Sequence, residues 1–458
     1  MAPRGAWLVL AAALLVIGFS SSASASTDPA SSYISCLNDQ GTPAQTTYED
    51  FVEGKPTRLL LRKAWWSEKA PRLQLTVVTG LTSSRLDQLE AQCASWKGPL
   101  SAAVYIVVRG DGAGGMGEEA RGQLEKAEAD AAEFHKKMEV ADGCQLDMSL
   151  LYEVVADDVM TMLLPINVMR NYALVQARTR LVAMVDVDLL LSATLSTWME
   201  SKDNVDYLQR ECAAKRVFVM PAFETPHNAD QAVAHKFAGD AVAIDKKGLE
   251  EMVGKRLVHQ FALYLFREGH NMTEYNKWFA ADKPYQVGWT KDYEPWFITD
   301  RFLNPFYDSV FRGYGWNKVT HVNNVNGQGF TFMVHPSAWI VHRQHGRSGA
   351  DKMYQSQKKA YEAEAKADPK KAEENTSLAG MTHRFRNKIL AALAEGSYAP
   401  SVDDGVKGCV ASLPWWQRED KGAAPFMEDE SYDGARRRGR RLMLRGHGGG
   451  GGGGGGVA

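Results

Sequence analysis

An alternation of apolar strands and helices between residues 73 and 191 constrains the fold more than any other feature of the sequence. The run 73–80 is rich in β-branched residues and ends in glycine, which is typical of a buried strand. Residues 83–98 carry apolar side chains at helical spacing, and 101–110 is a second apolar run. A strand, a helix and a strand within roughly forty residues predict a βαβ unit and therefore a parallel sheet.

The same alternation continues along the chain. The pattern predicts helices at 118–140, 165–179 and 247–266, strands at 150–156 and 179–192, a strand with a turn at 218–224, and a pair of strands within 329–342. After Ala350 the sequence is charged and helical in pattern and loses its strand character. The predicted fold class is therefore α/β, with a single open, mostly parallel, Rossmann-like sheet flanked by helices.

Composition narrows the class of protein. The chain has 458 residues, of which 45% are hydrophobic and 24% charged, as in an ordinary soluble protein with a large core. Its net charge of -2 gives no reason to expect nucleic acid as a partner.

The two ends differ from the centre. Residues 1–26 hold a short apolar run followed by Ala-Ser-Ala, which predicts a signal peptide or signal anchor and hence the secretory pathway. Such an anchor is the only expected membrane contact. We expect a stem at 27–70, the main domain at 71–349, a helical extension at 350–428 and a basic, glycine-rich tail at 429–458.

Cysteines and sequons agree with a secretory chain. Five cysteines allow up to two disulfides and one leftover thiol in an oxidising compartment, and no pairing follows from their spacing. No Cys-x-x-Cys occurs, which argues against zinc held by thiolates. Asn271 and Asn375 each begin an Asn-x-Ser/Thr sequon.

Two aspartates interrupt the apolar run 179–192. In a strand, Asp186 and Asp188 would project from the same face, at the point where the solid run ends. Open α/β sheets bind ligands beyond the carboxyl ends of their strands. Two adjacent carboxylates repel each other unless a cation neutralises them, and hard divalent ions bridge carboxylates to phosphates. The pair therefore predicts a metal-bound diphosphate of a nucleotide-sugar, although an Asp-x-Asp alone also occurs by chance.

Six segments carry a more specific pattern. They are WKGPLSAAVY (96–105), LLPINVMRNYAL (163–174), the strand with Asp186 and Asp188, VMPAFE (219–224), FRGYGWNKVTH (311–321) and HPSAWIVHRQH (335–345). In this order they resemble glycosyltransferase family 49, which includes the LARGE-type glucuronyltransferase domain and the β-1,4-glucuronyltransferase acting on dystroglycan O-mannose glycans. The resemblance covers residues 73–347.

The resemblance implies a GT-A fold, a Golgi lumen location with type II topology, a UDP-sugar donor, Mn²⁺ (or Mg²⁺) and inversion at the anomeric carbon. It makes Asp186 and Asp188 the metal-diphosphate site. A late histidine would complete the metal shell, for which His342 is preferred over His345.

The remaining site residues follow from the same resemblance and from side-chain chemistry. Nucleotide or donor contacts are expected from Thr79, Arg170, Asn171 and Lys318. Acceptor contacts are expected from Tyr314, Trp316 and Asn317, within an aromatic-rich stretch at 289–316. The catalytic base has three candidates, Glu224, Glu294 and Asp308, because asparagines at 323, 324 and 326 stand where the family carries acidic residues.

The sequence thus predicts a luminal, metal-dependent transferase that moves a sugar, with glucuronic acid as the candidate, from a UDP-sugar to a glycan or glycoprotein acceptor. The alternative is a catalytically degenerate glycan-binding or scaffold member of the same fold, which the asparagines motivate. A retaining hexosyltransferase of related fold is a third hypothesis.

Overall fold

The computed structural model describes residues 29–38, 45–112 and 115–417. The leader predicted at 1–26 and the tail predicted at 429–458 lie outside these ranges. Within them, no helix combines the length and the apolar character that crossing a membrane requires.

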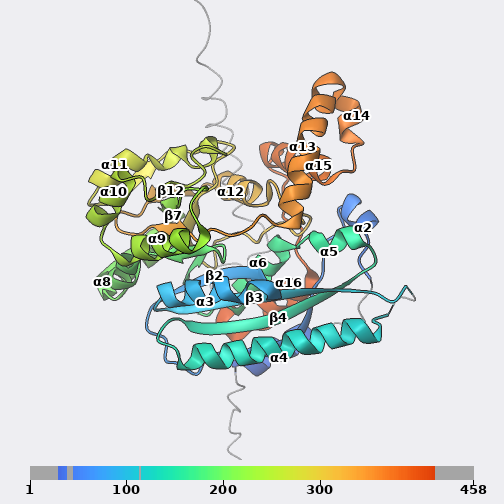
Figure 1. Cartoon of the computed structure of the whole chain (residues 1–458), viewed down its shortest axis with the longest axis horizontal. Coiled ribbons are helices and arrows are strands. Elements are labelled where there is room, and N and C mark those ends of the chain that lie inside the picture. Colours follow the sequence, from blue (N-terminus) through green and yellow to red (C-terminus); the bar gives the residue numbers. More distant parts are fainter. Residues whose placement is uncertain (1–28, 39–44, 113–114, 418–458) are drawn as a thin grey trace, which may run out of the picture.

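A nine-stranded sheet forms the centre of the molecule, in the order β1-β4-β3-β2-β5-β11-β7-β12-β10 (Figure 1). Its strands are β1 (Leu60–Trp65), β2 (Leu75–Thr82), β3 (Pro99–Arg109), β4 (Gln145–Val155), β5 (Leu181–Met184), β7 (Arg216–Met220), β10 (Tyr285–Val287), β11 (Trp296–Asp300) and β12 (Thr331–Val334). Strands β2, β3, β4, β5, β7 and β12 run in one direction, and β1, β10 and β11 run in the other. The predicted open, mostly parallel sheet is confirmed.

Helices cover both faces of this sheet because its strands are apolar on both sides. In β2, Val77 belongs to one apolar cluster and Val78 to another, as the alternation of side chains along a strand requires. The first face is covered by α3 (Leu86–Ser95), α4 (Glu118–Val140) and α8 (Lys202–Ala213). The second is covered by α1 (Pro29–Asn38), α6 (Ile166–Gln176) and α16 (Asp404–Ser412).

A second, four-stranded sheet was not expected, so the prediction of a single sheet is incomplete. Its order is β6-β13-β8-β9, with β6 (Leu189–Leu191), β8 (Ala222–Glu224), β9 (His259–Gln260) and β13 (Ile340–His342). Its register places Leu189, His342, Glu224 and His259 in one row across the four strands. The prediction of one strand over 179–192 was wrong, because a turn that holds both aspartates separates β5 from β6.

One further expectation needs correction. The helix predicted at 247–266 ends early, as α10 (Lys246–Gly254). Arg256 and Ala262 have φ values of 57° and 53°, in the left-handed region that a continuing helix does not allow. The segment after Trp316, for which the sequence analysis predicted no element, is α12 (Asn317–Gly327).

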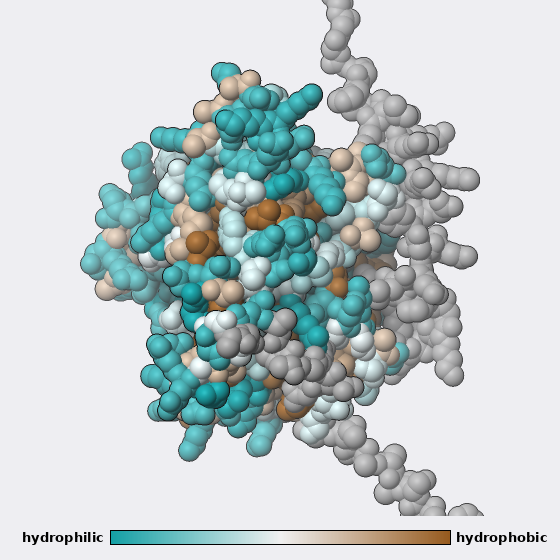
Figure 2. All heavy atoms as spheres, turned by 90° about the vertical axis from the view of Figure 1, so that its right-hand side faces the viewer, coloured by the Kyte–Doolittle hydropathy of each residue, from teal (hydrophilic) through white to brown (hydrophobic). Residues whose placement is uncertain are grey.

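The described residues also contain other α-helices. They are α2 (Tyr48–Val52), α5 (Asp158–Met162), α7 (Ala193–Met199), α9 (Gln231–Ala243), α11 (Tyr275–Ala280), α13 (Gly349–Ala367), α14 (Pro369–Glu373) and α15 (Leu378–Glu395). Helices α13 to α15 project together at the upper right of Figure 1. The face in Figure 2 is mainly hydrophilic, with hydrophobic residues showing in small areas between polar ones.

Disulfides join distant parts of the chain. Cys36 in α1 pairs with Cys409 in α16, and Cys93 pairs with Cys144. Cys212 is a buried free thiol. Two bridges and one leftover thiol match the number that five cysteines allow, and the pairing comes from the structure alone.

Candidate active site

The turn between β5 and β6 places Asp186 and Asp188 beyond the carboxyl end of a parallel strand. Strand β5 pairs with β2 up to Met184, and the turn follows directly. The Gln92 amide from α3 donates hydrogen bonds to the carbonyl oxygens of Asp186 (2.9 Å) and Leu189 (3.1 Å), which holds the turn. The predicted edge of the sheet is confirmed. Because the pair lies in a turn and not in a strand, the two carboxylates meet different partners.

Asp186 is held by two cations and an indole. Its Oδ1 accepts a hydrogen bond from Arg170 Nη2 at 2.8 Å. Its Oδ2 accepts from Trp296 Nε1 at 3.0 Å and from Lys318 Nζ at 3.2 Å. Burial acts to raise the pKa of Asp186, but the charges of Lys318 and Arg170 outweigh it and hold this pKa well below its usual range.

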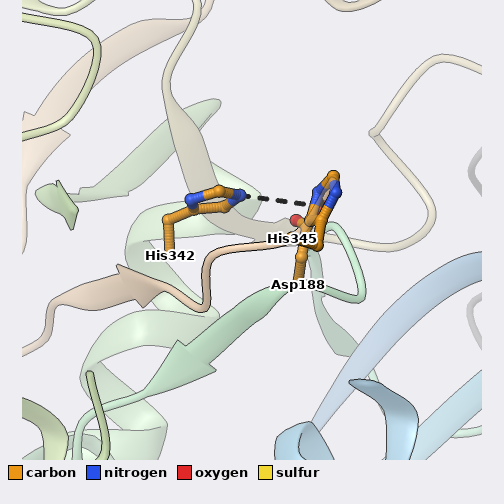
Figure 3. Close-up of side chains that lie close together, drawn as sticks. All are labelled: Asp188, His342 and His345. Atoms are coloured by element: carbon orange, nitrogen blue, oxygen red, sulfur yellow. Dashed lines mark hydrogen bonds and ion pairs between the residues drawn. The ribbon is translucent and has the colours of Figure 1, made fainter. Parts of the chain in front are cut away.

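Asp188 meets two histidines instead (Figure 3). Its Oδ2 lies 2.7 Å from Nε2 of His345 and 3.9 Å from Nε2 of His342. Burial acts to raise the pKa of Asp188, but the hydrogen bond from His345 and the charge of His342 lower it overall. The same hydrogen bond raises the pKa of His345, whereas burial lowers the pKa of His342.

These three side chains form a set of possible metal ligands. One ligand atom from each of Asp188, His342 and His345 lies within 4.8 Å of the others. One carboxylate oxygen and two imidazole nitrogens suit a divalent transition metal such as Mn²⁺. The donor chemistry therefore fits the expected ion. His345, which the sequence ranked second, is the histidine closer to Asp188.

Arg85 is a site residue that the sequence analysis missed. It ends the short helix η1 (Ser83–Arg85), which directly follows β2. Its Nη1 lies 3.5 Å from Oδ2 of Asp188, and its Nη2 lies 3.3 Å from Nδ1 of His345. The signal for it was present, because an arginine just after a parallel strand lies at the ligand-binding edge of the sheet.

Two residues predicted to contact the nucleotide, Thr79 and Asn171, lie in the core. Thr79 lies inside β2, paired with Ala102, and it is fully buried. Asn171 clamps the backbone of Tyr307, donating to its carbonyl oxygen and accepting from its N–H, both at 2.8 Å. Among the predicted donor contacts, the structure brings Arg170 and Lys318 to the Asp186 carboxylate, and it holds Thr79 and Asn171 in the scaffold behind them.

The three candidate bases differ in their surroundings. Asp308 is buried and accepts hydrogen bonds from the Tyr398 hydroxyl (2.8 Å) and the Val310 N–H (3.2 Å). The Glu224 side chain is 4% exposed, and its Oε1 accepts from the Ala262 N–H at 2.9 Å.

Glu294 is the most open of the three. Its side chain is 25% exposed, and its Oε1 lies 3.6 Å from Lys318 Nζ. Burial raises the pKa of Glu294 against the opposing charge of Lys318, and the charge of Asp186 raises it further. Of the candidates, Glu294 is therefore the carboxyl group that joins partial exposure to contact with the Asp186 cluster.

The predicted acceptor segment turns sharply before α12. Gly315 has a φ of 103°, and a Cβ there would lie 2.7 Å from the Tyr354 ring, so glycine is required. Tyr314 is 44% exposed. The Trp316 ring packs against Arg386, 4.1 Å from the guanidinium carbon, and Asn317 Oδ1 accepts from Arg170 at 2.8 Å.

The asparagines after this segment have structural partners. Asn323 is buried in α12, and its amide donates to the carbonyl oxygens of Lys291 (2.8 Å) and Val319 (2.7 Å). Asn324 is buried in the same helix. Both lie in the packed interior and not beside the Asp186 or Asp188 carboxylates.

Several known proteins are similar to this chain in structure or in sequence. A solved mannosyltransferase, PcManGT from Pyrobaculum calidifontis in complex with GDP-Man and Mn²⁺, has a TM-score of 0.28 and 11% identity over 87% of each chain, too low a similarity to support a conclusion. Xylosyl- and glucuronyltransferase LARGE2 of Mus musculus is 31% identical over 60% of this chain and 35% of its own length. LARGE1 of Homo sapiens is 28% identical over 61% of this chain and 32% of its own.

The chain spans about a third of the length of these curated relatives. The family model described as "Glycosyl-transferase for dystroglycan" matches residues 120–377, more than half of the chain, and these residues include Asp188, His342 and His345. The chain therefore belongs to this family, glycosyltransferase family 49.

Proposed function

We propose that this protein transfers a sugar from a UDP-sugar to a hydroxyl group of a glycan acceptor, with a divalent cation held by Asp188, His342 and His345. The observation that carries the proposal is this ligand set, beside Arg85, at the carboxyl end of a parallel sheet. Two disulfides support a place in the secretory pathway, the Golgi lumen by resemblance, because such bridges persist in oxidising compartments.

Positive side chains flank the ligand set on both sides. Arg85 lies on the side of β2, and Arg170 and Lys318 lie around Asp186. The guanidinium groups of Arg85 and Arg170 and the ammonium group of Lys318 are donors that suit an anionic diphosphate. A bound Mn²⁺ would neutralise charge on the diphosphate leaving group. Asp186 then serves to fix Arg170 and Lys318.

Glu294 is the base in this proposal. In an inverting transfer, the acceptor oxygen bonds to the anomeric carbon as the bond from that carbon to the UDP oxygen breaks. The acceptor proton passes to the Glu294 carboxylate, and UDP leaves with the bonding electron pair. A raised pKa makes a carboxylate a better base near neutral pH.

The donor sugar follows from the relatives, which are named for xylosyl and glucuronyl transfer. UDP-glucuronate and UDP-xylose are therefore the first donors to test. Lys318, 9% exposed at the edge of the Asp186 cluster, could meet the carboxylate of a glucuronyl group.

UDP release measured across UDP-sugars, with Mn²⁺ and with EDTA, tests the proposal. We expect release that requires Mn²⁺ and that falls about 10–100-fold or more in Asp188→Asn, as loss of a metal-site group does. Asp142→Asn, at an exposed surface carboxylate, is the matched control. Full turnover by folded Asp188→Asn would refute the metal assignment. Glycan binding that needs neither Mn²⁺ nor nucleotide, without UDP release, would favour the scaffold alternative, and the product anomer separates inversion from retention.

A further inference from the structure

Residues 261–270, here called the strap, connect the proposed metal ligand His342 with the proposed base Glu294. The strap begins directly after β9, and it contains the short helix η2 (Arg267–Gly269). At its first residue, the Phe261 ring makes edge contacts with His342 (5.6 Å between ring centroids) and Trp296 (5.2 Å). This end of the strap therefore touches both a proposed metal ligand and the indole that binds Asp186.

The other end of the strap reaches the proposed base. The carbonyl oxygen of Gly269 accepts a hydrogen bond from the Glu294 N–H at 2.8 Å. His270 is buried and stacks on Trp296, with 5.5 Å between ring centroids. The strap thus runs from His342, a proposed metal ligand, to Glu294, the proposed base.

The tip of the strap is apolar and open to solvent. Tyr264 is 77% exposed and Leu265 is 68% exposed. In the described part of the chain, Val140 is the only large apolar residue with a higher exposed fraction. The Tyr264 ring makes an edge contact with His259, with 5.6 Å between ring centroids, and His259 lies in the same row of the small sheet as Glu224 and His342.

The backbone of the strap is held in an uncommon conformation. Ala262 has a φ of 53°, which costs free energy for a residue other than glycine. The Glu224 carboxylate stabilises it by accepting the Ala262 N–H at 2.9 Å. Glu224 itself pairs with His342 across the small sheet, so the row that positions a metal ligand also positions the strap.

We propose that Tyr264 and Leu265 form a subsite for the second sugar ring of the glycan acceptor, and that Glu224 is a positioning residue that holds this subsite in place. The inference rests on the proposed function. A pyranose ring presents a face of C–H groups and a polar edge. A tyrosine offers a flat apolar face together with a hydroxyl group, which matches both. The reacting sugar would lie nearer to Glu294, and the next sugar would lie against the tip.

Steady-state kinetics with acceptors of two lengths test the subsite. The probes are methyl β-xyloside and β-1,4-xylobiose, alongside methyl β-galactoside and lactose, with the donor that wild type uses. In Tyr264→Ala we expect the disaccharide KM to rise about tenfold, equal to about 1.4 kcal/mol. The KM values for the monosaccharide and for the donor should stay within about twofold, since a tip residue touches neither. Val233→Ala, an exposed apolar residue on α9, is the matched control.

Two outcomes would overturn the subsite. An unchanged disaccharide KM in Tyr264→Ala means that the tip does not bind the second sugar. Equal increases for both acceptor lengths mean that the tip acts on the reacting sugar or on the fold. If wild type releases no UDP with any donor, the proposed function fails first, and this result is distinct from both.

Glu224 has a separate test, which distinguishes positioning from base catalysis. In Glu224→Gln the amide oxygen can still accept from the Ala262 N–H, so we expect acceptor KM and kcat close to wild type. In Glu224→Ala this bond is lost, and the disaccharide KM should rise as in Tyr264→Ala. If Glu224→Gln loses kcat as severely as Glu294→Gln does, Glu224 is a base and the positioning role is refuted.

Discussion

The structure predicts different outcomes for Asp186→Asn and Asp188→Asn, although the two residues occupy one short motif. Asp186 contacts two cationic side chains that are 4% and 9% exposed, and it is not among the possible metal ligands. An asparagine there can still accept from Arg170 through its oxygen. Its NH₂ group would then face Lys318 Nζ and Trp296 Nε1, both of which are donors.

The magnitude follows from these contacts. Breaking a buried ion pair costs about 3–5 kcal/mol. Because Asp186 is 28% exposed and asparagine retains one of its three bonds, we expect a loss of about 2–3 kcal/mol in the free energy of unfolding. Asp188→Asn removes the carboxylate from the ligand set, so its Mn²⁺ affinity should fall about 10–100-fold or more. Asp186→Asn should bind Mn²⁺ within about threefold of wild type, because the ligand set is intact.

Urea unfolding and titration calorimetry with Mn²⁺ measure the two quantities, with Asp142→Asn as the exposed control. If both variants lose Mn²⁺ affinity equally, Asp186 is a ligand and the assignment of separate roles is wrong. If Asp186→Asn unfolds like wild type, its contacts with Arg170 and Lys318 do not stabilise the fold.

Three further predictions concern glutamate side chains. Glu153→Gln should lower the free energy of unfolding, measured by urea unfolding, by about 3–5 kcal/mol. The reason is that Arg312, which is 1% exposed and 2.7 Å from Glu153, would keep its charge without a counter-ion. A loss below about 1 kcal/mol would contradict this. Glu294→Gln should abolish the acidic limb of the kcat–pH profile, since only the ionised carboxylate accepts a proton and its raised pKa places that limb above the usual range for glutamate; an unchanged limb would exclude Glu294 as the base. Burial raises the pKa of Glu224 to about 7, so the folded state binds a proton more tightly than the unfolded state does. The free energy of unfolding should therefore fall as pH rises from about 4.5 to 7. Urea titrations at several pH values should show that Glu224→Gln flattens this dependence. An equal slope of the free energy of unfolding against pH in wild type and variant would refute the raised pKa of Glu224.

Much of the large sheet could be predicted from the sequence, because the signals that specify it are local. The alternation of apolar runs and helical patterns depends on neighbours a few residues apart, and it correctly predicted strands β2, β3 and β4 and helix α4. The carboxyl edge where Asp186 and Asp188 lie follows from the same pattern, since parallel strands end on one side. The apolar run around the two aspartates was misread because hydrophobicity does not reveal a turn between two buried strands.

The assignment of partners depended on tertiary structure. Asp188 meets His345 across 157 residues of sequence, and Asp186 meets Lys318 across 132. The strap reaches Glu294 through a backbone hydrogen bond that no side-chain pattern records. The sequence alone determined that two carboxylates lie near the carboxyl end of a strand in a sheet that resembles those of glycosyltransferases. Only the folded chain decided that one of them binds cationic side chains and the other faces two histidines, because a turn rotates successive side chains apart and distant segments supply what each one meets.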